Sequence, residues 1–273
     1  MQKQHIFLNK STTGAPHHQS QPKRKYVTGM AFAFTLSEVL ITMGIIGVIA
    51  AITLQILVQN SQEKATVGKL KKAFSSVANA YTLATQENGT PDTWALIGAN
   101  SAPGAENMLN NFEPYFNITK KCGRNTGCFP SGNYRMPNGD PAFAVNSNST
   151  YAKARLSDGS SIYYRVYDAA CSFPVGGVSS VCGEFGVDTN GDKLPNELGV
   201  DLFTFYLSKS GITPMGTPKE TFISFASQCS DKTLGIHGGA YNGAGCTAWV
   251  LYNENMDYLK CSGLSWTGKN NCE

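Results

Sequence analysis

The sequence predicts an α+β fold, in which one long N-terminal helix packs on an antiparallel β-sheet in a disulfide-stapled globular domain. Three observations predict this class. A long apolar run near the N-terminus continues into a segment with helical apolar spacing, and short alternating runs between turn signals follow it. All eight cysteines lie in this last part of the chain. We therefore expect residues 90–273 to form a β-rich domain that follows the helix.

The charge of the chain is unevenly distributed. Residues 1–33 hold five of the 22 Lys and Arg residues and none of the 19 Asp and Glu residues. Without them the formal net charge changes from +3 to −2, because 17 basic residues then face 19 acidic ones. The basicity therefore belongs to an N-terminal leader, residues 1–33, and the rest of the chain is not predicted to bind nucleic acid.

Residues 34–58 form the apolar run, in which Glu38 is the one ionisable side chain. As a helix this run would be about 37 Å long, enough to cross a hydrocarbon layer of about 30 Å. Lys23, Arg24 and Lys25 precede it and place its N-terminal side in the cytoplasm by the positive-inside rule. No small-residue cleavage site follows the run, so we expect a retained transmembrane helix, with everything after it outside the cytoplasm.

Residues 59–89 continue this helix as an amphipathic segment. Its apolar side chains recur at spacings of three and four residues, and its polar side chains occupy the other face. The apolar stripe consists of Val67, Leu70, Phe74, Val77, Tyr81 and Ala84, and the polar face of Lys69, Lys71, Lys72, Ser75 and Asn79. Gly89 and Pro91 then supply a stop signal. We expect one helix from about Phe34 to about Asn88, with its stripe packed on the globular domain.

The rest of the chain reads as strands and turns. Residues 151–167 hold two alternating or aromatic runs around Asp158 and Gly159, which predicts a hairpin. Further strands are expected at 142–145, 183–187, 201–207, 221–226 and 246–252. The stretches "ALIGANSAPGAENML" and "VNSNST", residues 95–109 and 145–150, are expected to be connecting loops.

The cysteines predict disulfides. Their number is even, all of them follow the apolar run, and the outside of the cytoplasm is oxidising. Zinc sites need close pairs such as C-x-x-C, and the sequence contains none. The spacing does not determine the connectivity; we expect sequential pairing, which closes the shortest loops. The eight residues are Cys122, Cys128, Cys171, Cys182, Cys229, Cys246, Cys261 and Cys272.

The segment "DTNGDKLPN" is a candidate calcium loop. Asp188, Asn190, Asp192 and Asn196 stand at relative positions 1, 3, 5 and 9, where a tight loop can turn oxygen ligands toward one ion, and the Leu194 carbonyl lies between them. The match to an EF-hand is partial, since Lys193 replaces the glycine at position 6 and the twelfth position has no Glu. The alternative is a polar turn closed by Asx hydrogen bonds.

The residue inventory argues against an enzyme. Three of the four histidines, His5, His17 and His18, lie in the leader, and His237 stands alone in a glycine-rich stretch. The sequence contains no G-x-S-x-G elbow, H-E-x-x-H motif or phosphate-binding glycine loop. We expect no catalytic activity and no required cofactor, and a membrane-anchored extracellular enzyme is the least favoured alternative.

The stretch "AFTLSEVLITMGIIGVIAAITL", residues 33–54, closely resembles the N-terminal segment of type IV prepilins and type II secretion pseudopilins. The resemblance implies that a prepilin peptidase cuts between Ala33 and Phe34 and methylates the new N-terminus at Phe34. Glu38 is then fifth in the mature chain, as in the family. Cutting after Gly29 instead would place it ninth and is disfavoured. The family commonly has Gly where this chain has Ala33, and often Pro where it has Gln55.

The resemblance also implies architecture, function and partners. It implies a pilin-like domain and a structural subunit that polymerises through its apolar helix into a type IV pilus or a type II secretion pseudopilus. Its partners would be other pilin or pseudopilin subunits, the prepilin peptidase, the inner-membrane assembly platform and, before assembly, membrane lipid. The subunit would cross the inner membrane once, with its C-terminal domain periplasmic or extracellular.

Two later stretches, residues 186–205 and 246–261, resemble parts of long pilin-like proteins less specifically. The 240 residues left after a cut at Ala33 are many for a major subunit, and the C-terminal third is rich in aromatic residues and glycine. The alternative is therefore a minor or tip pilin that serves in binding or cell adhesion.

Glu38 has a predicted role in assembly. A carboxylate in the bilayer centre costs about 2.5–3.5 kcal/mol, and less near a helix end. After the cut, the amine of Phe34 on a neighbouring subunit could pair with Glu38 and neutralise both charges in a dry filament core. The alternative is a glutamate that reaches the cytoplasmic headgroups without a partner.

Overall fold

The structure is a computed structural model and describes residues 35–229 and 241–272. The chain divides into two units, the residues up to Ala51 and the residues from Ile52 onward. The described part of the first unit is helical. The second unit holds the sheet and all other helices in the described ranges.

Helix α1 (Leu36–Asn88) matches the predicted span of 34–88 within two residues. It ends where the sequence places its stop signal. Gly89 follows in the left-handed conformation, with φ at +78°, and its N–H donates to the Thr85 carbonyl at 3.1 Å. A glycine without Cβ takes this conformation at no steric cost, so the predicted C-terminal cap is confirmed. A short 3₁₀ turn, η1 (Pro91–Thr93), comes next.

The predicted apolar stripe of α1 packs on the core of the second unit. Val67, Leu70, Val77 and Ala84 are buried, as is Ala80 one turn before Ala84. Two larger side chains of the stripe are partly buried against the same core: the Phe74 ring stacks on Phe205 with centroids 5.8 Å apart, and the Tyr81 hydroxyl donates to the Ser208 and Lys209 carbonyls. The α+β prediction of a helix laid on a sheet is therefore confirmed.

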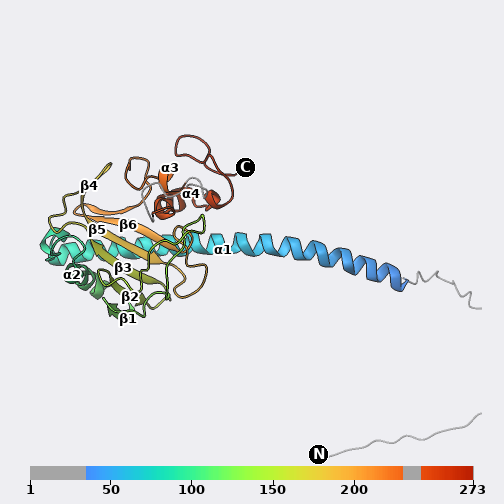
Figure 1. Ribbon diagram of the computed structural model, residues 1–273, viewed down its shortest axis with the longest axis horizontal. Helices are drawn as coiled ribbons and strands as arrows, with labels where there is room; N and C mark the ends of the chain where they lie inside the picture. Colours follow the sequence, from blue (N-terminus) through green and yellow to red (C-terminus); the bar gives the residue numbers. More distant parts are fainter. Residues whose placement is uncertain (1–34, 230–240, 273) are drawn as a thin grey trace, which may run out of the picture. The chain divides into compact units, whose positions relative to one another are not determined.

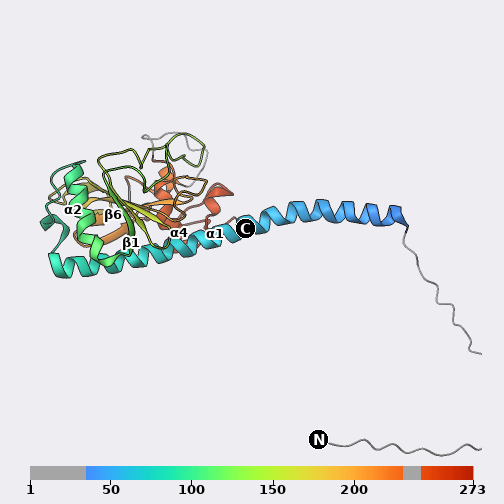
Figure 2. The same ribbon diagram turned by 90° about the horizontal axis from the view of Figure 1, so that it is seen from below.

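The sheet has seven antiparallel strands in the order β1-β2-β3-β5-β6-β7, with β4 beside β5. Figures 1 and 2 show these strands with the later part of α1 running along one face. The strands are β1 (Ile118–Gly123), β2 (Ala152–Leu156), β3 (Ser161–Val166), β4 (Phe173–Val175), β5 (Val178–Asp188), β6 (Leu202–Ser208) and β7 (Gly211–Pro214).

Side-chain alternation along the central strands divides the interior into two cores. On β3, Ile162, Tyr164 and Val166 belong to the core that α1 covers, whereas Tyr163 belongs to a second core on the opposite face. On β6, Phe205 belongs to the first core and Tyr206 to the second. Because successive strand residues point to opposite faces, both faces of this sheet are covered by other parts of the chain.

The expected hairpin at 151–167 is confirmed, because β2 and β3 pair with Ala152 opposite Tyr164 and Gly159 turns with φ at +88°. The expected strands at 183–187 and 201–207 lie within β5 and β6, with the second shifted by one residue. The expected loop at 145–150 is made of turns.

Three expected strands are wrong. Residues 142–145 form no strand; two of them, Ala142 and Phe143, exchange backbone hydrogen bonds with Tyr134. Residues 221–226 lead into helix α3 (Phe225–Gln228). Residues 246–252 belong mostly to helix α4 (Thr247–Asn253). Four successive residues at the start of α4, 247–250, are all buried. The apolar run of 246–252 was too short for its periodicity to distinguish a buried helix from a strand.

Helix α2 (Ala102–Phe112) begins within residues 95–109, which were expected to be a loop, and ends beyond them. Ser101 caps it by accepting a hydrogen bond from the Gly104 N–H, and its apolar face, which includes Met108 and Phe112, is buried. Phe112 stacks on Tyr164 of β3 at 5.1 Å. The small and polar residues of this segment hid its helical spacing. Strands β1, β4 and β7 were also missed, as were three further 3₁₀ turns: η2 (Glu113–Tyr115), η3 (Ala244–Cys246) and η4 (Asp257–Leu259).

Candidate functional site

The first candidate site is the start of α1. The predicted cut site, Ala33 and Phe34, with its methylated N-terminus, lies outside the described residues, which begin at Thr35. Thr35 and Glu38 form a reciprocal cap. Glu38 Oε2 accepts hydrogen bonds from the N–H and the hydroxyl of Thr35, both at 2.8 Å, and the Glu38 N–H donates to Thr35 Oγ1 at 3.2 Å.

This arrangement is a capping box, in which the first and fourth residues satisfy each other's free backbone donors. The capping box was not predicted from the sequence, although its signature, the spacing T-x-x-E, is present in "TLSE". These hydrogen bonds engage only Oε2 of the carboxylate. Glu38 therefore caps its own helix with one oxygen of the carboxylate, and these hydrogen bonds do not use the other.

The apolar run of α1 is exposed along its length. Leu40, Ile46 and Leu57 are 62%, 65% and 65% exposed, respectively. The most apolar stretch of α1 has a mean hydropathy of 2.4 and is not buried inside the chain, so by length and composition this helix is able to span a membrane. So much apolar surface in water is unfavourable by about 25 cal/mol per Å². It therefore needs a cover of lipid or of other protein.

The eight cysteines form four disulfides in sequential order, which confirms the expected pairing. The pairs are Cys122–Cys128, Cys171–Cys182, Cys229–Cys246 and Cys261–Cys272. All eight lie in the described ranges, and none is free. The loops that they close are short, from 6 to 17 residues in sequence separation. Each bond therefore staples a local segment of the domain.

The second candidate site is the loop between β5 and β6, which contains the predicted calcium ligands. Asp188 is buried, and its Oδ1 accepts hydrogen bonds from the N–H groups of Asn190 and Gly191 at 2.9 and 2.7 Å. Its Oδ2 accepts a hydrogen bond from the Tyr134 hydroxyl. This is an Asx turn reinforced by a tyrosine.

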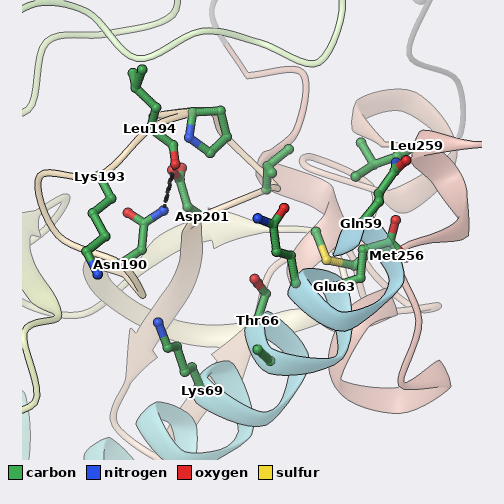
Figure 3. A pocket seen from close by; sticks show the side chains of 14 residues that line it. Gln59, Glu63, Thr66, Lys69, Asn190, Lys193, Leu194, Asp201, Met256 and Leu259 are labelled. Atoms are coloured by element: carbon green, nitrogen blue, oxygen red, sulfur yellow. Dashed lines mark hydrogen bonds between the residues drawn. The ribbon is translucent and has the colours of Figure 1, made fainter. Parts of the chain in front are cut away.

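Asp201 closes the other end of this loop and was not identified as a site residue from the sequence. It is buried, and its two carboxylate oxygens accept hydrogen bonds from the N–H groups of Asn196 and Glu197, each at 2.7 Å. The Asn190 side-chain amide also donates to Asp201 Oδ2, at 3.2 Å, and more weakly to the Leu194 carbonyl (Figure 3). Only the folded loop brings Asp201 next to Asn190.

The two carboxylates among the four predicted calcium ligands already have partners within the protein. Asp192 turns to Arg155 and pairs with its guanidinium at 2.7 Å, while both oxygens of Asp188 accept hydrogen bonds from within the protein. Asn190 Oδ1 and Asn196 Oδ1 are buried without a hydrogen-bond partner. The Asx hydrogen bonds of Asp188 are those of the alternative, a polar turn, and calcium binding stays a prediction.

The electrostatics of the loop are unusual for carboxylates. Burial raises the pKa of Asp188 to about 7, with the nearby charge of Asp201 as a further cause. Burial also raises the pKa of Asp201, although four hydrogen bonds to its carboxylate oppose this rise. Asp188 is therefore a carboxyl group that titrates near neutral pH inside the domain.

A cavity of about 390 Å³ lies between this loop and α1 (Figure 3). Glu63, Thr66 and Lys69 line it from the helix, and Leu194, which is 81% exposed, lies on its outer side on the loop. Glu63 pairs with Lys260 at 2.6 Å. The described lining residues include no His, Cys or Ser, and both carboxylates of the lining already have partners, Glu63 in Lys260 and Asp201 in backbone N–H groups of the loop.

His237 lies outside the described residues, and the described ranges contain no group of three or more His, Cys, Asp or Glu side chains arranged to hold a metal ion. In comparisons with protein-family models, with curated proteins and with solved structures, the chain matches none of them.

Proposed function

We propose that this protein is a structural subunit of a type IV pilus or a type II secretion pseudopilus. In this proposal a prepilin peptidase removes residues 1–33 and methylates Phe34, and the mature chain polymerises through α1. The domain that follows α1 is then a pilin-like domain on the outer side of the inner membrane. The chain acts by assembly and needs no catalytic group.

The observation that carries the proposal is the position of one carboxylate. Glu38 is the single ionisable residue in the apolar run of 34–58 and stands fifth after the expected cut at Ala33. A charge in an apolar helix is costly, so its presence calls for a partner or a function. The small residue before the cut and the Phe after it match the same family pattern.

The exposure of α1 supports assembly as the next step. Before assembly, lipid would cover the apolar run, and the assembly platform would have to lift it out of the bilayer. Since exposed apolar surface is unfavourable in water, extraction is feasible only if neighbouring helices replace lipid at the same time. Gly44 and Gly47 have no side chain, so the backbone of a neighbouring helix can approach α1 closely at these positions.

The test is mass spectrometry of the protein recovered from its native membrane or filaments. We expect an N-terminal peptide that begins with N-methylated Phe34. A peptide that begins at Met30 would move the cut to Gly29. Recovery of an intact Met1 terminus from assembled filaments would refute processing and, with it, the proposed class.

A minor or tip subunit with a binding role is the second candidate function. A cavity walled by aromatic side chains, on the sheet face opposite α1, favours it. Abundance discriminates the two, since a major subunit dominates sheared filaments and a tip subunit is scarce in them.

A further inference from the structure

The sheet face opposite α1 carries a second cavity of about 390 Å³. We call it the aromatic cavity. Its walls include four aromatic side chains, Phe143, Tyr151, Tyr167 and Tyr241, and two charged ones, Arg165 and Glu184. Concave sites of this size, mostly apolar but with a few convergent polar groups, are typical of small-molecule binding.

Strand alternation places the charged pair on this face. On β3, Arg165 stands between Tyr164 and Val166, whose side chains are buried in the core that α1 covers. On β5, Glu184 precedes Phe185 of the same core. Since neighbouring strand residues point to opposite faces, Arg165 and Glu184 point away from α1. The packing of α1 on the other face of the sheet therefore does not fill the aromatic cavity.

The guanidinium of Arg165 is held in place from several sides. It lies over the rings of Tyr151 and Tyr167, 5.9 and 5.1 Å from their centroids, and its Nε donates to Asn100 Oδ1 at 2.7 Å. Its Nη1 reaches Glu184 Oε1 only at 3.5 Å. The Arg165 side chain stays 22% exposed, so part of the guanidinium is accessible to a ligand. The planar donor group is thus oriented but not saturated.

Glu184 is almost fully buried, yet it keeps acceptor capacity. The Tyr167 hydroxyl donates to its Oε2, and its Oε1 has two long contacts at 3.5 Å, to Arg165 and to the Tyr163 hydroxyl. A buried ion pair stabilises a fold little, because desolvation offsets its attraction, and apolar side chains of similar volume often serve as well. Stability alone therefore does not account for this pair, and a binding role does.

We propose that the aromatic cavity binds a neutral carbohydrate of one or two rings. Arg165 and Glu184 together carry no net charge, present a donor and an acceptor side by side, and so match the hydroxyl groups of a sugar, which donate and accept. The negative faces of the aromatic rings attract the C–H groups of a sugar ring. The guanidinium already between two tyrosines repels a cationic ligand, and Glu184 repels an anionic one.

The inference does not rest on the proposed assembly function, because binding is measured on unassembled protein. The full chain is purified in lauryldimethylamine oxide, since detergents with sugar headgroups would compete. Maltose, lactose and chitobiose are titrated by calorimetry and by saturation-transfer NMR, with choline and glucuronate as cationic and anionic probes. We expect saturable binding of at least one disaccharide and weaker or no binding of both charged probes.

Variants of the cavity wall decide the location. Tyr241→Ala should weaken sugar binding about fivefold, the loss expected for one stacked ring, whereas Tyr241→Phe should retain it. Arg165→Lys, which keeps the charge but loses the planar fork, should also weaken it. Tyr252→Ala is the matched control, since Tyr252 is 60% exposed and lies outside the cavity lining. Near-ultraviolet circular dichroism verifies that each variant is folded.

Two results would overturn the inference. One is the absence of saturable binding of all three disaccharides at tens of millimolar, or binding that Tyr241→Ala and Arg165→Lys leave unchanged in folded protein. The other is preferential binding of choline or glucuronate that the same two variants abolish, which would assign the cavity to a charged ligand.

Discussion

Glu38 combines a local and a proposed intermolecular role. Its Oε2 closes the capping box with Thr35, which satisfies free donors at the start of α1. The proposed pairing with the Phe34 amine of a neighbour needs the charge of the carboxylate, whereas the capping box needs only an acceptor next to Thr35. These two roles make different demands on the two residues, so mutation of each residue separates them.

We predict that Glu38→Ala is processed and stays in the membrane but enters filaments at least about tenfold less well, because an unpaired buried amine costs several kcal/mol. Thr35→Val removes the cap and keeps the charge, so its loss should be only a few-fold, in line with about 1 kcal/mol for a helix cap. Thr35→Ser is the control that retains the cap. The measurement is the ratio of filament protein to membrane protein on immunoblots.

Normal incorporation of Glu38→Ala beside wild-type amounts of processed protein would remove Glu38 from the assembly mechanism. Equal defects in Glu38→Ala and Thr35→Val would assign its role to helix capping alone.

At the scale of elements, the loop between β5 and β6 depends on two buried carboxyl groups, Asp188 and Asp201. Each accepts hydrogen bonds from backbone N–H groups of the loop. A short polar segment in isolation cannot form these hydrogen bonds, so the fold of the loop depends on them. The same burial that strengthens these bonds makes ionisation of Asp188 unfavourable.

This predicts a pH dependence of stability. The pKa of Asp188 is raised to about 7, above its value in the unfolded chain, so the folded protein binds the extra proton between about pH 4 and 7. The stabilising contribution is complete below pH 4 and is lost as the pH rises through 7. The melting temperature of the parent protein should therefore decrease as the pH rises over this window. Asp188→Asn stays neutral and should lack most of this decrease, which corresponds to about 2–4 kcal/mol in the free energy of unfolding.

Thermal melts of the full chain in detergent at several pH values provide the measurement. Asp192→Asn is the matched control in the same loop, because the Asp192 side chain is 65% exposed. An Asp188→Asn variant with the same pH slope as the parent protein would contradict the assignment.

The same loop provides a test for calcium. The spacing of Asp188, Asn190, Asp192 and Asn196 predicts a site, whereas the hydrogen bonds of Asp188 and the pairing of Asp192 with Arg155 engage its carboxylates elsewhere. We therefore expect millimolar calcium to leave the melting temperature unchanged relative to a chelator. A calcium-dependent rise that Asp192→Asn abolishes would restore the four-ligand site.

At the scale of the whole molecule, the four disulfides and the two cores belong to the residues from Ile52 onward, and no described residue covers the apolar run of α1. Short disulfide loops restrict the unfolded chain by a few kcal/mol each. Disulfides persist in oxidising compartments, so the four bonds support the proposed location of the domain, and the exposed apolar run is able to contact lipid or other helices.

Alkylation of the purified protein tests the framework. Without reductant we expect no labelling at any of the eight cysteines, because none is a free thiol. Reduction of unfolded protein should give eight labels by mass spectrometry. Stoichiometric labelling without reductant would show that the disulfides are absent, and the prediction of an oxidising location would fail with them.

Features set by neighbouring residues were predictable from the sequence. The span and end of α1 follow from apolar spacing, Gly89 and Pro91, and the β2–β3 hairpin follows from alternation around Asp158 and Gly159. Sequential pairing of the cysteines was expected because it closes the shortest loops. In each case the residues that determine the feature lie within a few turns of each other, so their pattern carries the information.

The tertiary structure alone decided the rest. Residues 246–252 are mostly helical because the burial of four successive residues, 247–250, and not a propensity for strand, sets the structure of α4. Asp201 joins Asn190 only when the loop is folded, and Arg165 meets Glu184 only when β3 pairs with β5. Such contacts join residues that are distant in sequence. They form because a buried polar group without a hydrogen bond is unfavourable, so each group pairs with a partner that the fold brings close to it.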